Sequence, residues 1–276
     1  MTRTRWQRVV VQGVLAGFAI FAVTPLLWMV LTSVRPERLA KQSPLGLMAG
    51  ETTLDNYRRV SQETRVPRYV VNSFGVSWAT AAVVVAVAAP AGYSLSRFRF
   101  RGSRVVLMAG LAAVMLSGMT TVVPLYLMFR WLGLLNNLAG LVLINAVEAL
   151  PLSLWIMKAY VDAIPRQLDE MVQLDGGTPL TVFVRVILPV AMPALTAMGL
   201  YGFIVSWREF LLAATFVTRD TLKTLPVGIL GFFTEFGIEW GRLSATTVVA
   251  TVPALAVFWV LQRWLTPDVM AGAVKQ

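Results

Sequence analysis

The sequence predicts an all-α membrane protein with six transmembrane helices, and three observations lead to this prediction. Hydrophobic residues make up 57% of the 276 residues and charged residues only 14%, whereas an ordinary soluble domain has roughly 45–50% and about 25%. Much of the chain consists of long stretches without a charged side chain, and arginine bounds most of them. The net charge is +10. Sparse positive charge on so apolar a chain is typical of segments that flank membrane spans rather than of a nucleic-acid-binding surface.

Five of the uncharged stretches contain 20 residues or more, which is about the length that crosses the hydrocarbon core of a bilayer. They cover residues 9–34, 69–96, 105–129, 186–207 and 243–262. We expect a sixth span over residues 138–157, although Glu148 and Pro151 interrupt it, because both flanks are strongly apolar and Lys158 can anchor its end. The first stretch is long for a signal peptide and is expected to be retained. No repeat or separate soluble segment is visible, so residues 1–276 are expected to form a single membrane domain.

Charge gives a weaker indication of orientation. Lys and Arg are almost evenly divided between the two sides of the predicted spans. The connection over residues 97–104 is short and holds four arginines without an acid. Because short loops weigh more in setting topology, this connection favours a cytoplasmic location for both termini.

The residue inventory excludes several classes of chemistry. The chain has no Cys and no His, which excludes a disulfide framework, Cys/His zinc ligation, cysteine nucleophiles and His-based triads. It has no Gly-x-x-x-x-Gly-Lys-Ser/Thr phosphate loop, so it does not bind ATP by that route. Its few carboxylates form no recognisable hydrolytic pair or metal cluster. We therefore expect no catalytic residue and no metal site.

The connection over residues 158–185 is the most informative segment. Pro165 suits the first turn of a helix, and apolar residues follow it at i, i+3, i+4 spacing, namely Leu168, Met171 and Val172. The run Asp175-Gly176-Gly177 predicts a helix end, because glycine accepts a left-handed backbone. Thr178-Pro179 is a good start for a second helix. A short helix with an apolar stripe is unstable alone in water, so it needs a partner surface.

This segment resembles the permease subunits of binding-protein-dependent ABC importers. Their signature has Glu-Ala-Ala, two free positions, Asp-Gly-Ala, and then Phe and Leu-Pro at fixed distances. The matching residues here are Glu170, Asp175, Gly176, Phe183, Leu188 and Pro189, whereas Met171, Val172 and Gly177 replace the alanines. Further stretches are similar to the carbohydrate branch of the family, the shorter permease of maltose/trehalose-type systems. They are residues 25–33, 123–126 with 132–134, 206–210, 224–228 and 272–275.

The resemblance implies a type I importer permease fold with a cytoplasmic coupling helix that docks on an ATPase. The residues expected to form this coupling site are Leu168, Glu170, Met171, Val172, Asp175, Gly176 and Gly177. It also implies a second permease subunit, two ATPase subunits that bind ATP and Mg²⁺, an extracytoplasmic binding protein and a sugar substrate. The location would be a bacterial or archaeal cytoplasmic membrane. The alternative for this segment is a helix that merely lies on the membrane surface.

Polar residues within or at the end of the predicted spans are candidates for the solute path: Asn72, Ser77, Thr120, Glu148, Arg208 and Glu209. An intramembrane carboxylate such as Glu148 is costly and indicates a functional site by default, while a structural bond with a neighbour such as Asn145 is the alternative. Arg208 could donate to sugar hydroxyls or to an acidic substituent, or could anchor its span together with Glu209. Most hydroxyl and amide groups in spans only bond backbone or neighbouring helices.

The outer loop over residues 221–241 contains four aromatic residues, Phe232, Phe233, Phe236 and Trp240. They are candidates for contact with a binding protein, and an interfacial aromatic belt is the alternative. For the whole chain, the rival function is a proton- or ion-driven transporter or a structural membrane subunit. A proton-coupled carrier would normally show several intramembrane acids or a histidine, whereas only Glu148 is central here.

Overall fold

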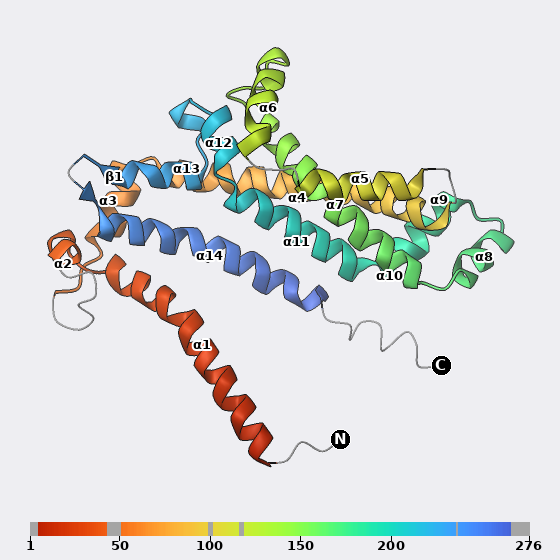
Figure 1. The fold of residues 1–276 in the computed structure, drawn as a ribbon, viewed down its shortest axis with the longest axis horizontal. Coiled ribbons are helices and arrows are strands. Elements are labelled where there is room, and N and C mark those ends of the chain that lie inside the picture. The colour runs from red at the N-terminus through yellow and green to blue at the C-terminus, as the bar shows by residue number, and fades with distance from the viewer. Residues whose placement is uncertain (1–4, 43–50, 99–101, 116–118, 236, 266–276) are drawn as a thin grey trace. The chain divides into compact units, whose positions relative to one another are not determined.

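The computed structural model describes residues 5–42, 51–98, 102–115, 119–235 and 237–265, and nearly all of their regular structure is helical (Figure 1). The long helices are α1 (Arg5–Ser33), α4 (Val66–Arg97), α7 (Leu138–Ala163) and α14 (Trp240–Leu265). Within the described residues, these four are long and apolar enough to cross a membrane. They contain the predicted spans 69–96, 138–157 and 243–262, and all but the last residue of 9–34.

The predicted span 186–207 is divided by a sharp bend. One helical stretch consists of α9 (Pro179–Val182), a π-helical turn (Phe183–Ile187) and α10 (Leu188–Val190), and α11 (Met192–Arg208) follows it. The two stretches meet at 77°. Pro189 and Pro193 stand on either side of Ala191 at the bend. Proline has no N–H and its ring blocks a continuous helix, so the straight part begins at Met192 rather than at residue 186.

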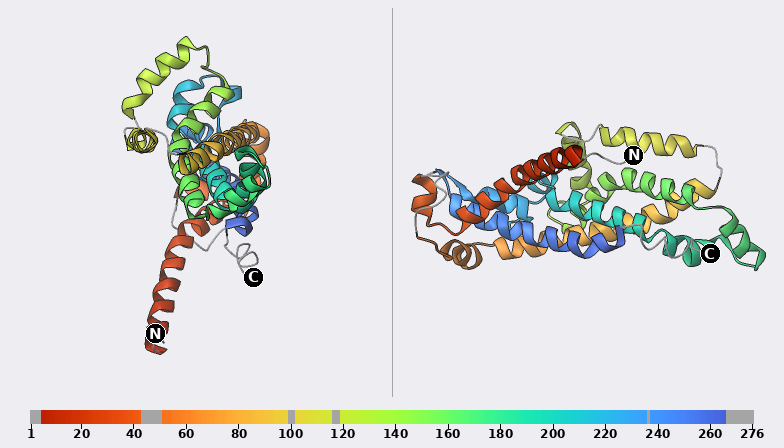
Figure 2. Two further views of the ribbon diagram at one scale, coloured as in Figure 1. Left: turned by 90° about the vertical axis from the view of Figure 1, so that its right-hand side faces the viewer. Right: turned by 90° about the horizontal axis from the view of Figure 1, so that it is seen from below.

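The expectation of one continuous helix over residues 105–129 also needs correction. This stretch coincides with α5 (Ser103–Met115) and α6 (Met119–Trp131), which run in different directions (Figure 2), and residues 116–118 lie outside the described residues. Neither helix alone reaches the roughly 20 residues of a span. With the bent pair counted as one, the described part of the chain has up to five candidate spans.

The remaining elements are short. They are α2 (Glu37–Gln42), α3 (Asp55–Glu63), α8 (Gln167–Leu174), α12 (Leu211–Phe216), α13 (Leu225–Ile229), and 3-10 turns at Asp220–Leu222 and Leu230–Phe232. A small antiparallel hairpin pairs β1 (Phe233–Thr234) with β2 (Gly237–Ile238). The chain divides into two compact units, Met1–Pro67 with Gly228–Val252, and Arg68–Val227 with Pro253–Gln276.

In the first unit, polar groups join the end of α1 to α3, and α2 to the start of α14. The Asn56 amide nitrogen donates to the backbone oxygens of Ser33 at 2.9 Å and Arg35 at 2.7 Å. The backbone N–H of Gly241 donates to the Glu37 carboxylate at 2.8 Å. These bonds satisfy buried polar groups that would otherwise destabilise the loop between the helices.

In the second unit, α4, α7 and α11 approach one another closely at small residues. A Cβ added to Gly92 of α4 would lie 2.7 Å from the Cβ of Met157 on α7, and one added to Gly202 of α11 would lie 3.3 Å from a valine methyl of α4. Between α7 and α11, the buried Asn145 amide donates to the Ser206 hydroxyl at 2.9 Å. Small residues and interhelical hydrogen bonds are the usual means of packing helices in a membrane.

Replacement of Gly92 by Ala should therefore destabilise the protein. The new methyl group would meet both the Met157 side chain and the backbone nitrogen of Lys158, at 2.7 and 3.1 Å, and overpacking of this kind costs about 1–3 kcal/mol. Gly75→Ala in the same helix is the control, because nothing lies within 4 Å of its added Cβ. Thermal unfolding of the purified variants measures the difference. Equal melting temperatures for G92A and G75A would contradict the close packing of α4 on α7.

Candidate functional site

The connection between α7 and α11 folds as a helix, a tight turn and a second helix. Helix α8 ends at Leu174, and the backbone N–H of Gly177 donates to the Val172 oxygen at 2.8 Å, closing the turn. Gly176 has a φ of +81°, a left-handed conformation that favours glycine. Thr178 then caps α9 with its side chain, and Pro179 occupies the first turn. The predicted helix end and helix start are thus confirmed.

The two adjacent glycines are needed for different reasons. At Gly176 the space around an added Cβ is open, and the backbone angle alone disfavours another residue. At Gly177 an added Cβ would lie 2.6 Å from a Val172 methyl and 2.7 Å from the Val172 oxygen. Gly177 therefore lets the turn approach α8 closely, which fixes the angle between α8 and α9.

Helix α8 has an exposed apolar stripe on one side. Leu168, Met171 and Leu174 are 38%, 62% and 87% exposed, respectively. Val172, expected on the same contact face, is instead half-buried and packs against the core cluster that contains Met157. Leu174 was not among the expected residues, although its i+3 spacing from Met171 could have indicated it. Glu170 and Asp175 are exposed beside the stripe.

A cavity of about 800 Å³ in the second unit brings together three of the residues expected on the solute path. Its wall comes from α6, α7, α11 and α12 and is mainly apolar. The charged residues that line it are Glu148, Arg208 and Glu209. Thr120, another expected residue, does not line the cavity, whereas its neighbour Thr121 does.

The three charged groups of the cavity differ in what they bind. Both oxygens of Glu209 accept backbone N–H groups at the start of α12, from Leu212 at 2.6 Å and from Ala213 at 2.8 Å. Glu148 and Arg208 make no hydrogen bond or ion pair with any residue that the structure describes. Because Asn145 bonds Ser206, it is not the partner of Glu148. The cavity thus offers an open acceptor and an open donor.

Asn72 and Ser77, also expected on the path, lie elsewhere in α4. Asn72 donates to the backbone oxygens of Thr221 at 3.0 Å and Lys223 at 2.9 Å, and thereby holds the loop before α13. Ser77 is fully buried. Neither lines the cavity. Asn72 thus fits the structural alternative, in which a polar group of a span bonds backbone, whereas the buried Ser77 Oγ has no hydrogen-bond partner among the described residues.

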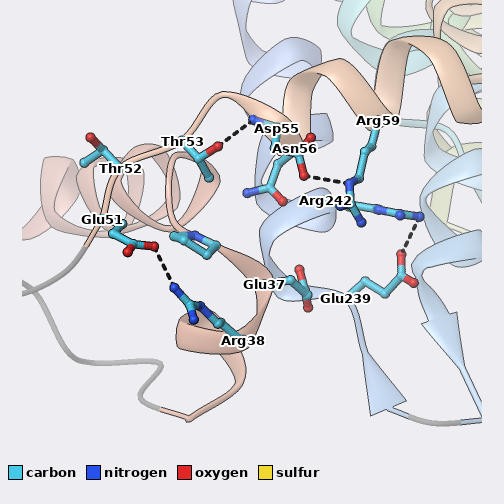
Figure 3. A pocket seen from close by; sticks show the side chains of 11 residues that line it. Glu37, Arg38, Glu51, Thr52, Thr53, Asp55, Asn56, Arg59, Glu239 and Arg242 are labelled. Atoms are coloured by element: carbon cyan, nitrogen blue, oxygen red, sulfur yellow. Dashed lines mark hydrogen bonds and ion pairs between the residues drawn. The ribbon is translucent and has the colours of Figure 1, made fainter.

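The first unit has a polar pocket of about 650 Å³ that the sequence did not indicate (Figure 3). Its charged groups are largely paired: Arg38 with Glu51 at 2.6 Å, Arg59 with Asp55 at 2.7 Å, and Arg242 with Glu239 at 3.3 Å. No group of acids in the described residues is arranged to hold a metal ion. The pocket is thus a polar surface whose arginines are all paired with acids of its own lining.

The aromatic residues of the outer loop are not equivalent. Phe232 is buried, Phe233 is exposed in β1, and Trp240 is half-buried with its ring edge-on to Trp28, at 6.2 Å between centroids. Phe236 lies outside the described residues. Of the described three, Phe233 alone presents most of its ring to the outside.

Comparison with known proteins places this chain in a family. The family model described as "Binding-protein-dependent transport system inner membrane component" matches residues 6–271. The chain belongs to this permease family. The resemblance seen in the connection between α7 and α11 is thereby confirmed, and this permease is a multi-pass protein of the inner membrane that is not itself an enzyme.

Relatives of this permease match it along nearly its whole length. It is 31% identical over 257 residues to the trehalose transport system permease protein SugB of Mycobacterium tuberculosis, covering 92% of this chain and 93% of the relative. It is 31% identical over 260 residues to the trehalose/maltose transport system permease protein MalG of Thermococcus litoralis, covering 93% of each. A chain of a crystal structure described as a bacterial ABC transporter for import of the acidic polysaccharide alginate has the same fold. Its TM-score is 0.81 at 24% identity, covering 96% of this chain and 100% of that one.

Replacing Glu209 should lower the stability of the protein more than replacing its neighbour Arg208. Glu209→Ala removes both acceptors at the start of α12, and loss of such a helix cap costs about 0.5–2 kcal/mol. Arg208→Ala removes an exposed side chain and should change stability by less than about 0.5 kcal/mol. Hydrogen exchange at the Leu212 and Ala213 amides should accelerate in E209A alone. Equal protection in both variants would show that Glu209 does not hold α12.

Proposed function

We propose that this permease is one of two membrane subunits of an ATP-driven sugar importer and that α8 couples it to a separate ATPase. The observation that carries the proposal is the exposed apolar stripe of α8, formed by Leu168, Met171 and Leu174, on a helix closed by the tight turn at Gly176 and Gly177. Such a stripe on an amphipathic helix is typical of a partner contact. The sugar is inferred from the relatives, which are named for trehalose and maltose transport.

The topology that goes with this proposal has six spans within a single membrane domain over residues 1–276. The family match across residues 6–271 supports one domain, since it runs through both compact units. In this topology α5 and α6 together form the third span, and α11 with the bent stretch before it forms the fifth. Both termini and α8 then lie in the cytoplasm, as the four arginines of residues 97–104 favour.

The partners follow from the same proposal. A second permease encloses the other half of the path, two ATPase subunits hold ATP and Mg²⁺, and an extracytoplasmic binding protein delivers the sugar. Relatives of the fold support such an assembly, since one solved structure is described as a bacterial alginate ABC transporter in complex with an alginate pentasaccharide-bound periplasmic protein. The exposed Phe233 is proposed to contact the binding protein, whereas Phe232 is buried and is no longer a candidate for that contact.

Coupling requires that α8 contacts both the ATPase and the core of the permease, so that movement of the ATPase also moves the spans. The apolar stripe supplies adhesion to the ATPase, because burying a large apolar side chain stabilises a contact by about 1.5–3 kcal/mol. Glu170 is exposed beside the stripe and can pair with a basic group of the ATPase. Val172, which lies next to the stripe, packs against the permease's own core. Helix α8 thus connects two bodies.

The cavity supplies the polar contacts for a solute. Its volume of about 800 Å³ lies within the roughly 300–1,000 Å³ of small-molecule sites. Sugar hydroxyls both donate and accept hydrogen bonds, and Glu148 accepts whereas Arg208 donates. Glu209 shapes the wall by holding the start of α12. In the assembled importer, the second permease closes the open side of this cavity.

The coupling role can be tested by charging the stripe. The double variant M171D/L174D should reduce co-purification of the ATPase by about tenfold or more, since two buried apolar contacts are lost. Leu54→Asp is the control, because Leu54 is also strongly exposed, at 71%, but lies at the start of α3. Pull-down of tagged permease from membranes measures the bound ATPase. Wild-type capture by M171D/L174D would refute the docking role of α8.

If the cavity residues line the solute path, their replacement should impair sugar uptake rather than capture of the ATPase. R208A and E148Q should each lower sugar uptake by about tenfold or more, because hydrogen bonds to charged groups contribute about 1.5–3 kcal/mol. Capture of the ATPase should be unchanged. Arg130→Ala at the end of α6 is the control, since Arg130 is exposed and does not line the cavity. Uptake of labelled sugar by liposomes containing the whole importer measures the effect, and normal uptake by both variants would remove these residues from the path.

A further inference from the structure

A buried ion pair joins the end of α4 to the first turn of α8. The Arg97 Nε lies 2.6 Å from Oδ2 of Asp169, and the two side chains are only 7% and 11% exposed. The Arg97 Nη2 donates to Oδ1 of Asp169 at 3.4 Å and to the backbone oxygen of Ile164 at 3.0 Å. Ile164 is the residue that caps the C-terminus of α7. One guanidinium thus holds three elements: α4, the end of α7, and α8.

Both partners occupy ends of helices that suit their charge. Arg97 is the last residue of α4 and Asp169 lies in the first turn of α8. A cation at a helix C-terminus and an anion at a helix N-terminus are each favoured by the helix dipole. The pair therefore fixes which end of α4 meets which end of α8.

Further bonds hold both sides of the turn to the same part of α4. Before α8, Arg166 donates from Nη2 to the backbone oxygen of Ser96 at 3.2 Å. After the turn, the Tyr93 hydroxyl donates to the Pro179 oxygen at 3.3 Å, and its ring lies 5.2 Å from that of Phe183. Residues 93–97 therefore contact the chain both upstream and downstream of α8.

This end of α4 is itself fixed in the second unit. Gly92 lies against Met157 of α7 with no room for a Cβ, and Ala88, Ala89 and Tyr93 belong to the core cluster that also receives Val172 of α8. A force applied to α8 meets no flexible linker before it reaches α4. A buried ion pair is weak evidence for stability, because apolar residues often replace one without loss. Its presence here calls for another role.

We propose that Arg97 and Asp169 are positioning residues that transmit movement of α8 to α4. The inference rests on the proposed coupling function and adds the route by which motion leaves α8. The ATPase moves α8 through its apolar stripe, and the ion pair makes the cytoplasmic end of α4 follow. Without the pair, α8 still docks on the ATPase but tilts independently of α4. ATP is then hydrolysed without a matching movement of solute.

The test uses the whole importer in liposomes and the double variant R97M/D169L. This variant removes both charges and leaves no unpaired one, so the permease is expected to accumulate and to capture the ATPase as wild type does. Stimulation of ATP turnover by sugar-loaded binding protein should fall at least about fivefold, while turnover without binding protein persists. Uptake per ATP hydrolysed should fall in parallel. A purely structural role would not change this ratio at equal assembly.

Two further variants sharpen the result. R97K should be intermediate, because Lys keeps the charge but cannot hold Asp169 and the Ile164 oxygen with a planar fork. K158Q is the matched control: the Lys158–Asp162 pair is nearby at 2.5 Å, but both residues belong to α7, so its loss should leave stimulation unchanged.

The outcomes distinguish this inference from the function on which it rests. Wild-type stimulation in R97M/D169L, or in R97K if the double variant does not assemble, would overturn the role of the ion pair while leaving the coupling function intact. A wild-type assembly whose ATP turnover did not respond to loaded binding protein would overturn the importer function and this inference with it.

Discussion

The close approach of α4, α7 and α11 is the constraint on which the rest of the second unit depends. In a membrane, apolar side chains gain little by leaving lipid for protein, so helices associate through tight packing and interhelical hydrogen bonds. Gly92 and Gly202 permit that packing, and the bond between Asn145 and Ser206 fixes its register. The cavity is walled partly by α7 and α11, and α8 is attached to α4 and α7. Both candidate sites therefore depend on this three-helix contact.

Sequence reasoning succeeded where the governing physics is local. Long uncharged stretches predicted α1, α4 and α14, and the strongly apolar flanks of Glu148 predicted α7, because crossing hydrocarbon sets a length and a composition. Asp175, Gly176 and the Thr178-Pro179 pair predicted the turn after α8 because backbone angles and caps depend on immediate neighbours. Hydropathy alone does not reveal the break before α11. Pro189 and Pro193 stand two residues on either side of Ala191, and they indicated the bend.

The functional surfaces were less predictable because they depend on tertiary packing. An i, i+3, i+4 pattern placed Val172 with Leu168 and Met171, but Val172 packs inward and Leu174 is the residue that extends the stripe. Both arrangements satisfy helical spacing, and only the position of the core decides between them. Likewise, no local pattern distinguishes a carboxylate that caps a helix, as Glu209 does, from one that stays open to a cavity.

Some charged groups of the permease bind other groups of the permease, and others line the cavity without such a bond. Arg97, Asp169 and Glu209 are bound to groups of the permease itself, so they fix elements in place. Glu148 and Arg208 line the cavity without a bond to any described residue. An ionised side chain within a span is costly unless it faces water or a partner. In the proposed solute path, water removes that cost, and a solute that replaces the water must restore its hydrogen bonds. On that proposal, Glu148 and Arg208 favour solutes rich in hydroxyl groups over apolar ones.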